Sequence, residues 1–134
     1  MKYLVLLGRL FYSAIFIGSG LGHFSSGTVQ YAQMHGVPMG GFLVPFSGVL
    51  ALLGGLSILL GYRTRIGAWL IVLFLVPVTF MMHDFWNVQE SGLKLMQQAM
   101  FMKNLSLLGA ALLIAYWGAG PCSLCSNKSE HKKK

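Results

Sequence analysis

The stretch IGAWLIVLFLVPVTFMMH, residues 66–83, decides the fold because it contains no aspartate, glutamate, lysine or arginine. A helix rises about 1.5 Å per residue, so a helix over this stretch crosses a hydrocarbon core of roughly 30 Å. Apolar runs of similar length occupy residues 3–24, 42–60 and 100–117. Helices of a soluble bundle would each need a polar face, and none of these runs shows one. The sequence therefore predicts an all-α fold, an integral membrane bundle of four transmembrane helices.

The composition agrees with a chain that is embedded in lipid. Of the 134 residues, 55% are hydrophobic and 10% are charged, whereas about 25% are charged in an average soluble domain. We expect one transmembrane domain over residues 1–120 and a basic tail over residues 121–134. The run 3–24 is longer than the apolar part of a usual signal peptide, and no clear cleavage site follows it, so we expect it to be a retained helix.

The distribution of basic residues predicts how the helices are oriented. Most basic side chains fall at one set of helix ends or in the tail: Lys2, Arg9, Arg63, Arg65, Lys128, Lys132, Lys133 and Lys134. The opposite side has Lys94 and Lys103, together with Asp84 and Glu90. By the positive-inside rule, both termini are expected in the cytoplasm. The formal charge of +7 is then explained by a basic tail beside an anionic lipid leaflet, without a nucleic acid.

Polar residues gather at the outer ends of the predicted helices, although polar groups in a membrane are costly and require partners. They come from separate segments of the chain: His23, His83, Asp84, Gln97, Gln98, Lys103 and Asn104. Lys103 lies about one turn inside the run 100–117, where the positive end of the helix dipole would help it to hold an anionic or electron-rich oxygen. Asp84 is the expected ion-pair partner of Lys103 when no ligand is bound.

The segment HDFW, residues 83–86, has two interpretations. Tryptophan commonly lies at the boundary between lipid and water, so the segment can be an interfacial belt. Together with Lys103 and Asn104, it can instead form a small polar pocket in the outer leaflet, roofed by Phe85 and Trp86. The residues leave both interpretations open.

The predicted pocket gives each polar residue a role. Lys103 and Asn104 would donate hydrogen bonds to a ligand oxygen on which negative charge develops. His83 is the candidate proton carrier, since imidazole exchanges protons near neutral pH, and Asp84 would orient it or pair with Lys103. The catalytic candidates are His83 and Asp84, and the ligand-binding candidates are Lys103, Asn104, Trp86, His23 and Arg9. Arg9 has the alternative of extending its side chain to the cytoplasmic face.

Two histidines and two cysteines have alternative roles in cofactor binding and redox chemistry. His23 and His83 could ligate a haem from two helices, but this cofactor is not favoured. No metal site is expected, because no motif offers three or four zinc ligands at a usual spacing. Cys122 and Cys125 form a C-x-x-C and are a redox candidate. Their expected cytoplasmic location disfavours a stable disulfide, and inert or lipidated thiols remain alternatives.

Several segments, taken in their order and spacing between Arg9 and Leu124, carry a resemblance to a known family. They are GRLFYSAIFIGSGLGHF, GVP, LLGGLSILLGYRTRIGAWL, HDFW, FMKNLSLLGAALL and a closing Gly-x-Gly-Pro. Together they resemble the DoxX family of small four-helix membrane proteins. The resemblance implies a multi-pass protein of the bacterial cytoplasmic (inner) membrane. Some relatives are linked to thiosulfate:quinone oxidoreductase, and others to membrane complexes that handle thiol or oxidative stress. It also implies that Arg9, His83, Trp86, Lys103 and Asn104 are the family's polar positions.

The chain departs from the family pattern at three places. His23 stands where relatives often have lysine, and Ala51 stands where they often have glutamate. Without that acid, a proton-coupled step that needs it is not expected. Cys125 stands where the family tail often has aspartate, so the C-x-x-C belongs to this chain and not to the family site.

These observations leave three functions open. The first is a redox-linked membrane subunit, at most a subunit of a quinone-linked oxidoreductase. It would bind a quinone or a small sulfur or oxygen species and work with a membrane or cytoplasmic redox partner protein. The second is a non-enzymatic assembly partner or anchor of a membrane complex. The third is a carrier of a small solute or lipid, which would need a homo-oligomer such as glycine-rich helix faces permit. The sequence contains no phosphate loop, nucleotide fingerprint or Ser-His-Asp pattern.

Overall fold

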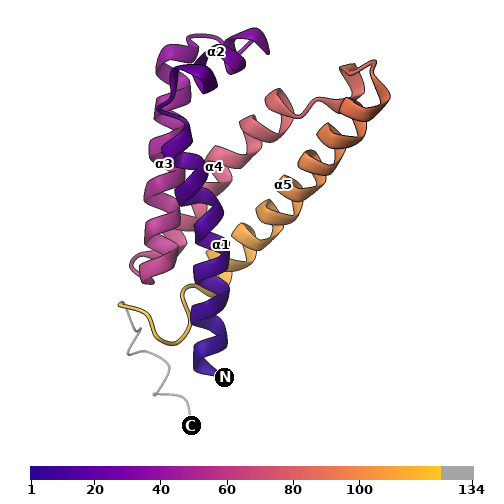
Figure 1. Cartoon of the computed structure of the whole chain (residues 1–134). Helices are drawn as coiled ribbons and strands as arrows, with labels where there is room; N and C mark the ends of the chain where they lie inside the picture. The colour runs from indigo at the N-terminus through magenta and orange to yellow at the C-terminus, as the bar shows by residue number, and fades with distance from the viewer. Residues whose placement is uncertain (125–134) are drawn as a thin grey trace.

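The computed structural model describes residues 1–124 as a bundle of helices (Figure 1). Two short elements, α2 (Ser26–Met34) and the 3-10 helix η1 (Phe85–Asn87), lie in connections at the same end of the bundle. The part of the chain that is described contains no strand. Four helices are long and apolar enough to cross a membrane: α1 (Lys2–Gly22), α3 (Gly40–Leu60), α4 (Thr64–Met82) and α5 (Ser91–Trp117). The predicted all-α bundle of four transmembrane helices is confirmed.

One helix differs from its prediction in a way that affects the site. α5 begins at Ser91 and not at residue 100. The Glu90 carboxylate accepts hydrogen bonds from the backbone N–H groups of Gly92 (2.8 Å) and Leu93 (2.6 Å), which satisfies amides that a helix start leaves unpaired. The predicted effect of a helix N-terminus on Lys103 is therefore wrong, because Lys103 lies several turns inside α5.

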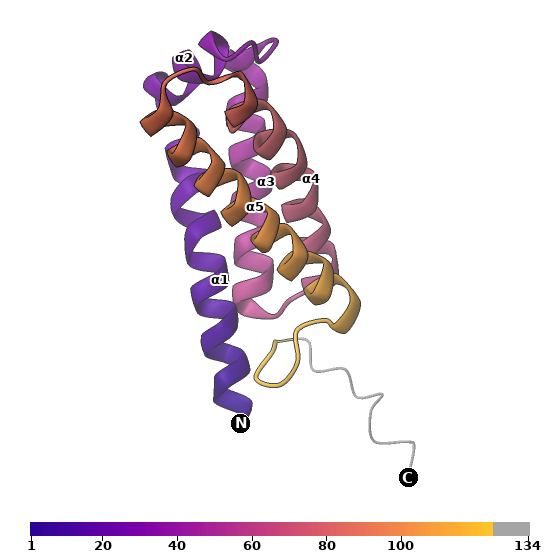
Figure 2. The ribbon, with the colours of Figure 1, turned by 90° about the vertical axis from the view of Figure 1, so that its right-hand side faces the viewer.

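Each transmembrane helix packs mainly on its neighbours in the order α1, α3, α4, α5. Toward the end that carries α2, the pair of α4 and α5 leans away from α1 and α3 (Figure 1). After a quarter turn, α5 crosses in front of the other long helices (Figure 2). Figure 1 shows that α1 and α5 diverge toward this end, and the order of packing agrees, because these two helices are not neighbours in it.

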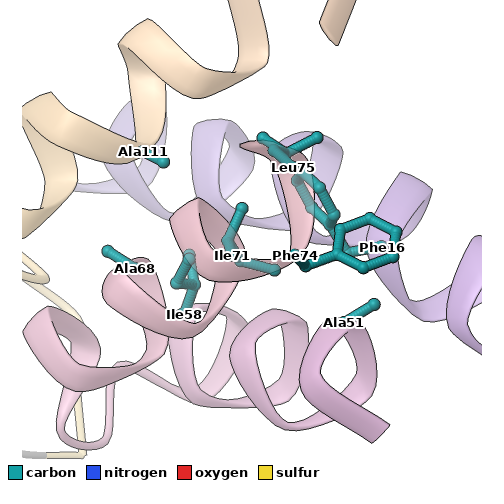
Figure 3. Packing of buried hydrophobic residues seen from close by; sticks show 8 residues of the cluster. All are labelled: Phe16, Ala51, Ile58, Ala68, Ile71, Phe74, Leu75 and Ala111. Carbon is teal, nitrogen blue, oxygen red and sulfur yellow. The ribbon is translucent and has the colours of Figure 1, made fainter. Parts of the chain in front are cut away.

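Glycines bring the backbone of α3 close to both of its neighbours. A Cβ atom on Gly48 would lie 2.8 Å from the carbonyl oxygen of Gly20 in α1, and one on Gly54 would lie 2.9 Å from that of Gly67 in α4. Small residues allow such close approach of helices in lipid. Next to these crossings lies the apolar core shown in Figure 3: Phe16, Ala51, Ile58, Ala68, Ile71, Phe74, Leu75 and Ala111.

Gly48→Ala is expected to lower the thermal unfolding midpoint in detergent, because the new methyl group would push α1 away from α3. Overpacking of this kind costs about 1–3 kcal/mol. Gly18→Ala in α1 is the matched control, since nothing lies within 4 Å of a Cβ atom there. The control should be neutral or stabilising, because alanine favours a helix over glycine by about 1 kcal/mol. Equal midpoints for the two variants would contradict the close crossing.

The Glu90 cap is expected to make stability depend on pH in the acid range. Hydrogen bonds from the backbone of Leu93 and Gly92 lower the pKa of Glu90 below its ordinary value of 4.5. The stabilisation is therefore fully present above that ordinary value and is lost as the pH falls through the lower, folded pKa. Glu90→Gln should lower the unfolding midpoint at neutral pH, and the difference from the unchanged protein should shrink in acid. A difference that stays constant over the pH series would exclude the cap as its source.

Candidate functional site

A cavity of about 130 Å³ lies between α1, α4 and α5. Apolar side chains, among them Phe16, Phe74 and Leu75, form much of its lining. A cavity of about 150 Å³ in another protein is known to hold benzene, so this one has room for one six-membered ring or a smaller molecule. Its lining also includes His83, which follows α4 at the end where α1 and α5 diverge.

Three of the predicted site residues, His83, Lys103 and Asn104, line this cavity together. His23 does not line it but lies directly behind it. The His23 ring packs at 5.4 Å from the ring of Phe74, and its Nδ1 donates a hydrogen bond to the backbone carbonyl of Ser19 (2.6 Å). The sequence thus identified three polar residues of the cavity by their location in otherwise apolar segments, and it missed Ser19, which also lines the cavity.

Asn104 is the most deeply buried polar group of the cavity, with 6% of its surface exposed. Within residues 1–124, no hydrogen bond uses its side-chain amide. In this part of the chain, the hydroxyls of Ser13, Thr64 and Thr79 are also unpaired, but they are fully enclosed and do not line the cavity. The amide of Asn104 keeps some accessible surface, and Asn104 lines the cavity, so a small molecule in the cavity can reach the amide. Asn104 therefore has both donors and an acceptor available for a molecule in the cavity.

His83 is held by Gln97, which the sequence reasoning did not assign to it. His83 Nδ1 and Gln97 Oε1 are 2.7 Å apart. The prediction missed this pair because it placed Gln97 in a loop ahead of the last helix, whereas Gln97 lies inside α5. The signal that could have revealed this pair is the Glu90 cap. A helix that starts at this cap contains Gln97 and places it beside His83.

The predicted ion pair between Asp84 and Lys103 is wrong. Asp84 Oδ2 accepts a hydrogen bond from Asn87 Nδ2 in η1 (2.8 Å), so Asp84 neither orients His83 nor reaches Lys103. Lys103 is exposed, and its Nζ lies 3.4 Å from the sulfur of Met100. In the described part of the chain, Lys103 has no carboxylate partner, which leaves its ammonium available at the edge of the cavity.

The aromatic residues behind His83 do not roof the cavity. Phe85 and Trp86 pack on Phe101 of α5, with ring centroids 5.5 and 5.9 Å from it, and neither lines the cavity. Trp86 is 49% exposed at the end of the bundle. Its location fits the interfacial belt, the alternative that the sequence left open.

The model of the DoxX family matches residues 4–84 of the chain. The chain belongs to the DoxX family. The inner membrane protein YqjF of Escherichia coli (strain K12) is 37% identical to it over 122 residues, which cover 90% of this chain and 88% of YqjF. The inner membrane protein YphA of the same strain is 31% identical over 123 residues, which cover 90% of this chain and 87% of YphA. No solved structure matches the chain.

In this DoxX protein, Arg9 lies at the other end of the bundle from the cavity. Its side chain is only 5% exposed. It does not line the cavity. It points toward the end of the bundle where the chain leaves α5, which is the direction that the alternative from the sequence expected, although the side chain stays buried there. Its guanidinium donates hydrogen bonds to the backbone carbonyls of Ala119 (3.4 Å from Nη1) and Cys122.

These hydrogen bonds from Arg9 hold residues 118–124 against the end of the bundle opposite α2. The backbone N–H of Leu124 donates to the carbonyl of Leu60 (3.1 Å) at the end of α3. Positive φ angles of 82° at Gly118 and 67° at Gly120 allow the chain to turn back after α5. Cys122 is exposed, and its predicted redox partner Cys125 lies outside the described residues. Between residues 1 and 124 there is no cluster of three or more His, Cys, Asp or Glu side chains that could hold a metal ion.

Arg9→Gln is expected to loosen residues 118–124, because a neutral amide cannot replace two charge-assisted hydrogen bonds. Hydrogen–deuterium exchange of this segment in detergent should accelerate about tenfold or more, since hydrogen bonds to charged groups contribute about 1.5–3 kcal/mol. Arg63→Gln is the control, because Arg63 is an exposed arginine at the same end of the bundle. Unchanged exchange in Arg9→Gln, or the same acceleration in both variants, would contradict the role of Arg9.

Proposed function

We propose that this DoxX protein is a redox-linked membrane subunit that binds a small ligand with an electron-rich oxygen or sulfur atom in the cavity between α1, α4 and α5. A quinone head group is the leading candidate. The observation that carries the proposal is the buried and unpaired amide of Asn104. A ligand oxygen or sulfur in the cavity could pair with this amide, which has no partner in the described part of the chain.

The shape and chemistry of the cavity support a ring with polar substituents. Its volume suits one six-membered ring, and Phe16 and Phe74 supply an aromatic wall. Lys103 offers a positive charge at the edge, where it would favour negative charge that develops on a ligand oxygen. His83 would exchange the proton that accompanies such a change. The link to redox chemistry comes from the family resemblance, which ties some relatives to quinone oxidoreduction.

The proposal also includes the location of the protein and of its cavity. Both E. coli relatives are named inner membrane proteins, and the four long apolar helices suit a multi-pass protein of that membrane. Lys2, Arg9, Arg63 and Arg65 belong to the end of the bundle opposite α2. By the positive-inside rule, that end faces the cytoplasm and the cavity lies in the outer leaflet.

Quinone binding is tested by substitutions that remove the polar groups of the lining. Asn104→Leu and Lys103→Ala should each weaken the binding of a short-chain ubiquinone about tenfold or more, because each removes a hydrogen-bond donor to the ligand oxygen. Lys94→Ala is the matched control, since Lys94 is an exposed lysine of α5 that does not line the cavity. Binding is measured by titration of the purified protein in detergent, and native ligands are identified by mass spectrometry.

The same experiment can overturn the proposal. If neither the native extract nor the titration shows a quinone or another small oxygen or sulfur compound, the cavity is not a ligand site of this kind. A stoichiometric protein partner in that preparation would then favour the assembly function. If Lys94→Ala weakens binding as much as Lys103→Ala, the ligand is held by the general charge of α5 and not by the cavity.

A further inference from the structure

The partner of His83 determines which hydrogen bonds the cavity can make. The carbonyl oxygen Oε1 of Gln97, 2.7 Å from His83 Nδ1, can only accept a hydrogen bond. The proton of the neutral imidazole must then be on Nδ1, and the other ring nitrogen, Nε2, has a free lone pair. His83 lines the cavity and Gln97 does not. Because Nδ1 is engaged by Gln97, Nε2 is the ring nitrogen left to pair with a molecule in the cavity, and it would pair as an acceptor.

The neutrality of Gln97 matters for this assignment. A carboxylate at that place would stabilise the imidazolium, in which both nitrogens donate. The chain has a carboxylate directly after His83, but Asp84 is occupied by the side chain of Asn87 at 2.8 Å. The one hydrogen-bond partner of the imidazole in the described part of the chain is therefore an uncharged amide.

The two sides of the cavity are thus chemically different. On the α4 side, His83 Nε2 accepts. On the α5 side, the ammonium of Lys103 only donates, and the amide of Asn104 both donates and accepts. A ligand that satisfies both sides must carry an acidic X–H group for His83 and an electron pair for the donors of α5. A ring that bears only carbonyl oxygens would leave Nε2 without a partner.

We propose that the cavity selects the hydroxyl-bearing form of a small aromatic ring, a phenol or hydroquinone, and that Gln97 is the positioning residue that sets this preference. The inference rests on the proposed function and deepens it, because it assigns the reduced quinol form and not the oxidised quinone as the better-bound species. The ring-sized volume and the aromatic wall favour a phenolic O–H over a smaller thiol. No bond is made or broken in this step, which is a hydrogen bond from the ligand to Nε2.

A pair of isomeric probes tests the preference at constant size. 4-Methylphenol and anisole contain the same atoms, but only the first has an O–H group. The full-length protein in detergent should bind 4-methylphenol about tenfold more tightly than anisole, because a site built to accept from a hydroxyl rejects an analogue that lacks it. Gln97→Glu should abolish this ratio, since the imidazolium would donate to either probe. Gln98→Ala is the matched control, because the adjacent Gln98 is exposed, and it should keep the ratio.

A second measurement on the unaltered protein keeps the inference testable if Gln97→Glu does not fold. The nitrogen-15 spectrum of the His83 imidazole reports directly which ring nitrogen carries the proton. A proton on Nδ1 supports the inference, and a proton on Nε2 overturns it. Equal binding of the two probes overturns the preference but leaves the cavity as a ligand site. Binding of neither probe counts against the proposed function itself and removes this inference with it.

Discussion

Helices in lipid gain little by burying apolar side chains against one another, because the lipid chains are as apolar as the helices. The glycine crossings of α3 with α1 and with α4 are therefore the contacts on which this bundle depends. At Gly48 and Gly54 the neighbouring backbones approach so closely that a single added methyl group would meet a carbonyl oxygen. These crossings fix three helices as a unit, and α5 joins that unit through α4 alone for most of its length.

The cavity is a consequence of this arrangement. α1 and α5 have no glycine crossing with each other, and they diverge toward the end that carries α2. One hydrogen bond, from the Tyr12 hydroxyl to the carbonyl of Leu107 (2.9 Å), joins them at the depth of the cavity. Beyond it the space between them is filled incompletely, and Asn104 remains buried without a partner. A bundle with four equal interfaces would have closed this space with apolar side chains.

The sequence predicts the parts of this structure that depend on hydropathy and misses those that depend on particular contacts. The ends of α1, α3 and α4 lie within about two residues of the apolar runs, because lipid exposure requires apolar side chains along each helix. The start of α5 was misplaced because residues 91–99 are held in the helix by the Glu90 cap and not by hydropathy. That error hid Gln97 and gave Lys103 a helix terminus that it does not have.

The sequence also predicted which polar residues gather at the site, but not which partners they contact. His83, Lys103 and Asn104 interrupt apolar runs, so their location signals a shared polar layer. The pairing of Asp84 with Lys103 was inferred from charge alone, and η1 directs the carboxylate elsewhere. The partners of Arg9 could not be predicted either. They are backbone carbonyls after the end of α5, and a residue of any type could supply them.

The contacts of Arg9 also constrain the order in which this protein can assemble. α1 leaves the ribosome first, while Ala119 and Cys122 are synthesised after all the helices have been made. Until then the guanidinium of Arg9 has none of the carbonyl partners that it has in the finished bundle, and an unpaired charge is costly away from water. The charge of Arg9 in α1 is therefore paired only after the chain has been made as far as Cys122. A chain that stops after α5 would retain the four transmembrane helices. It would still lack the backbone carbonyls that pair with Arg9 of α1.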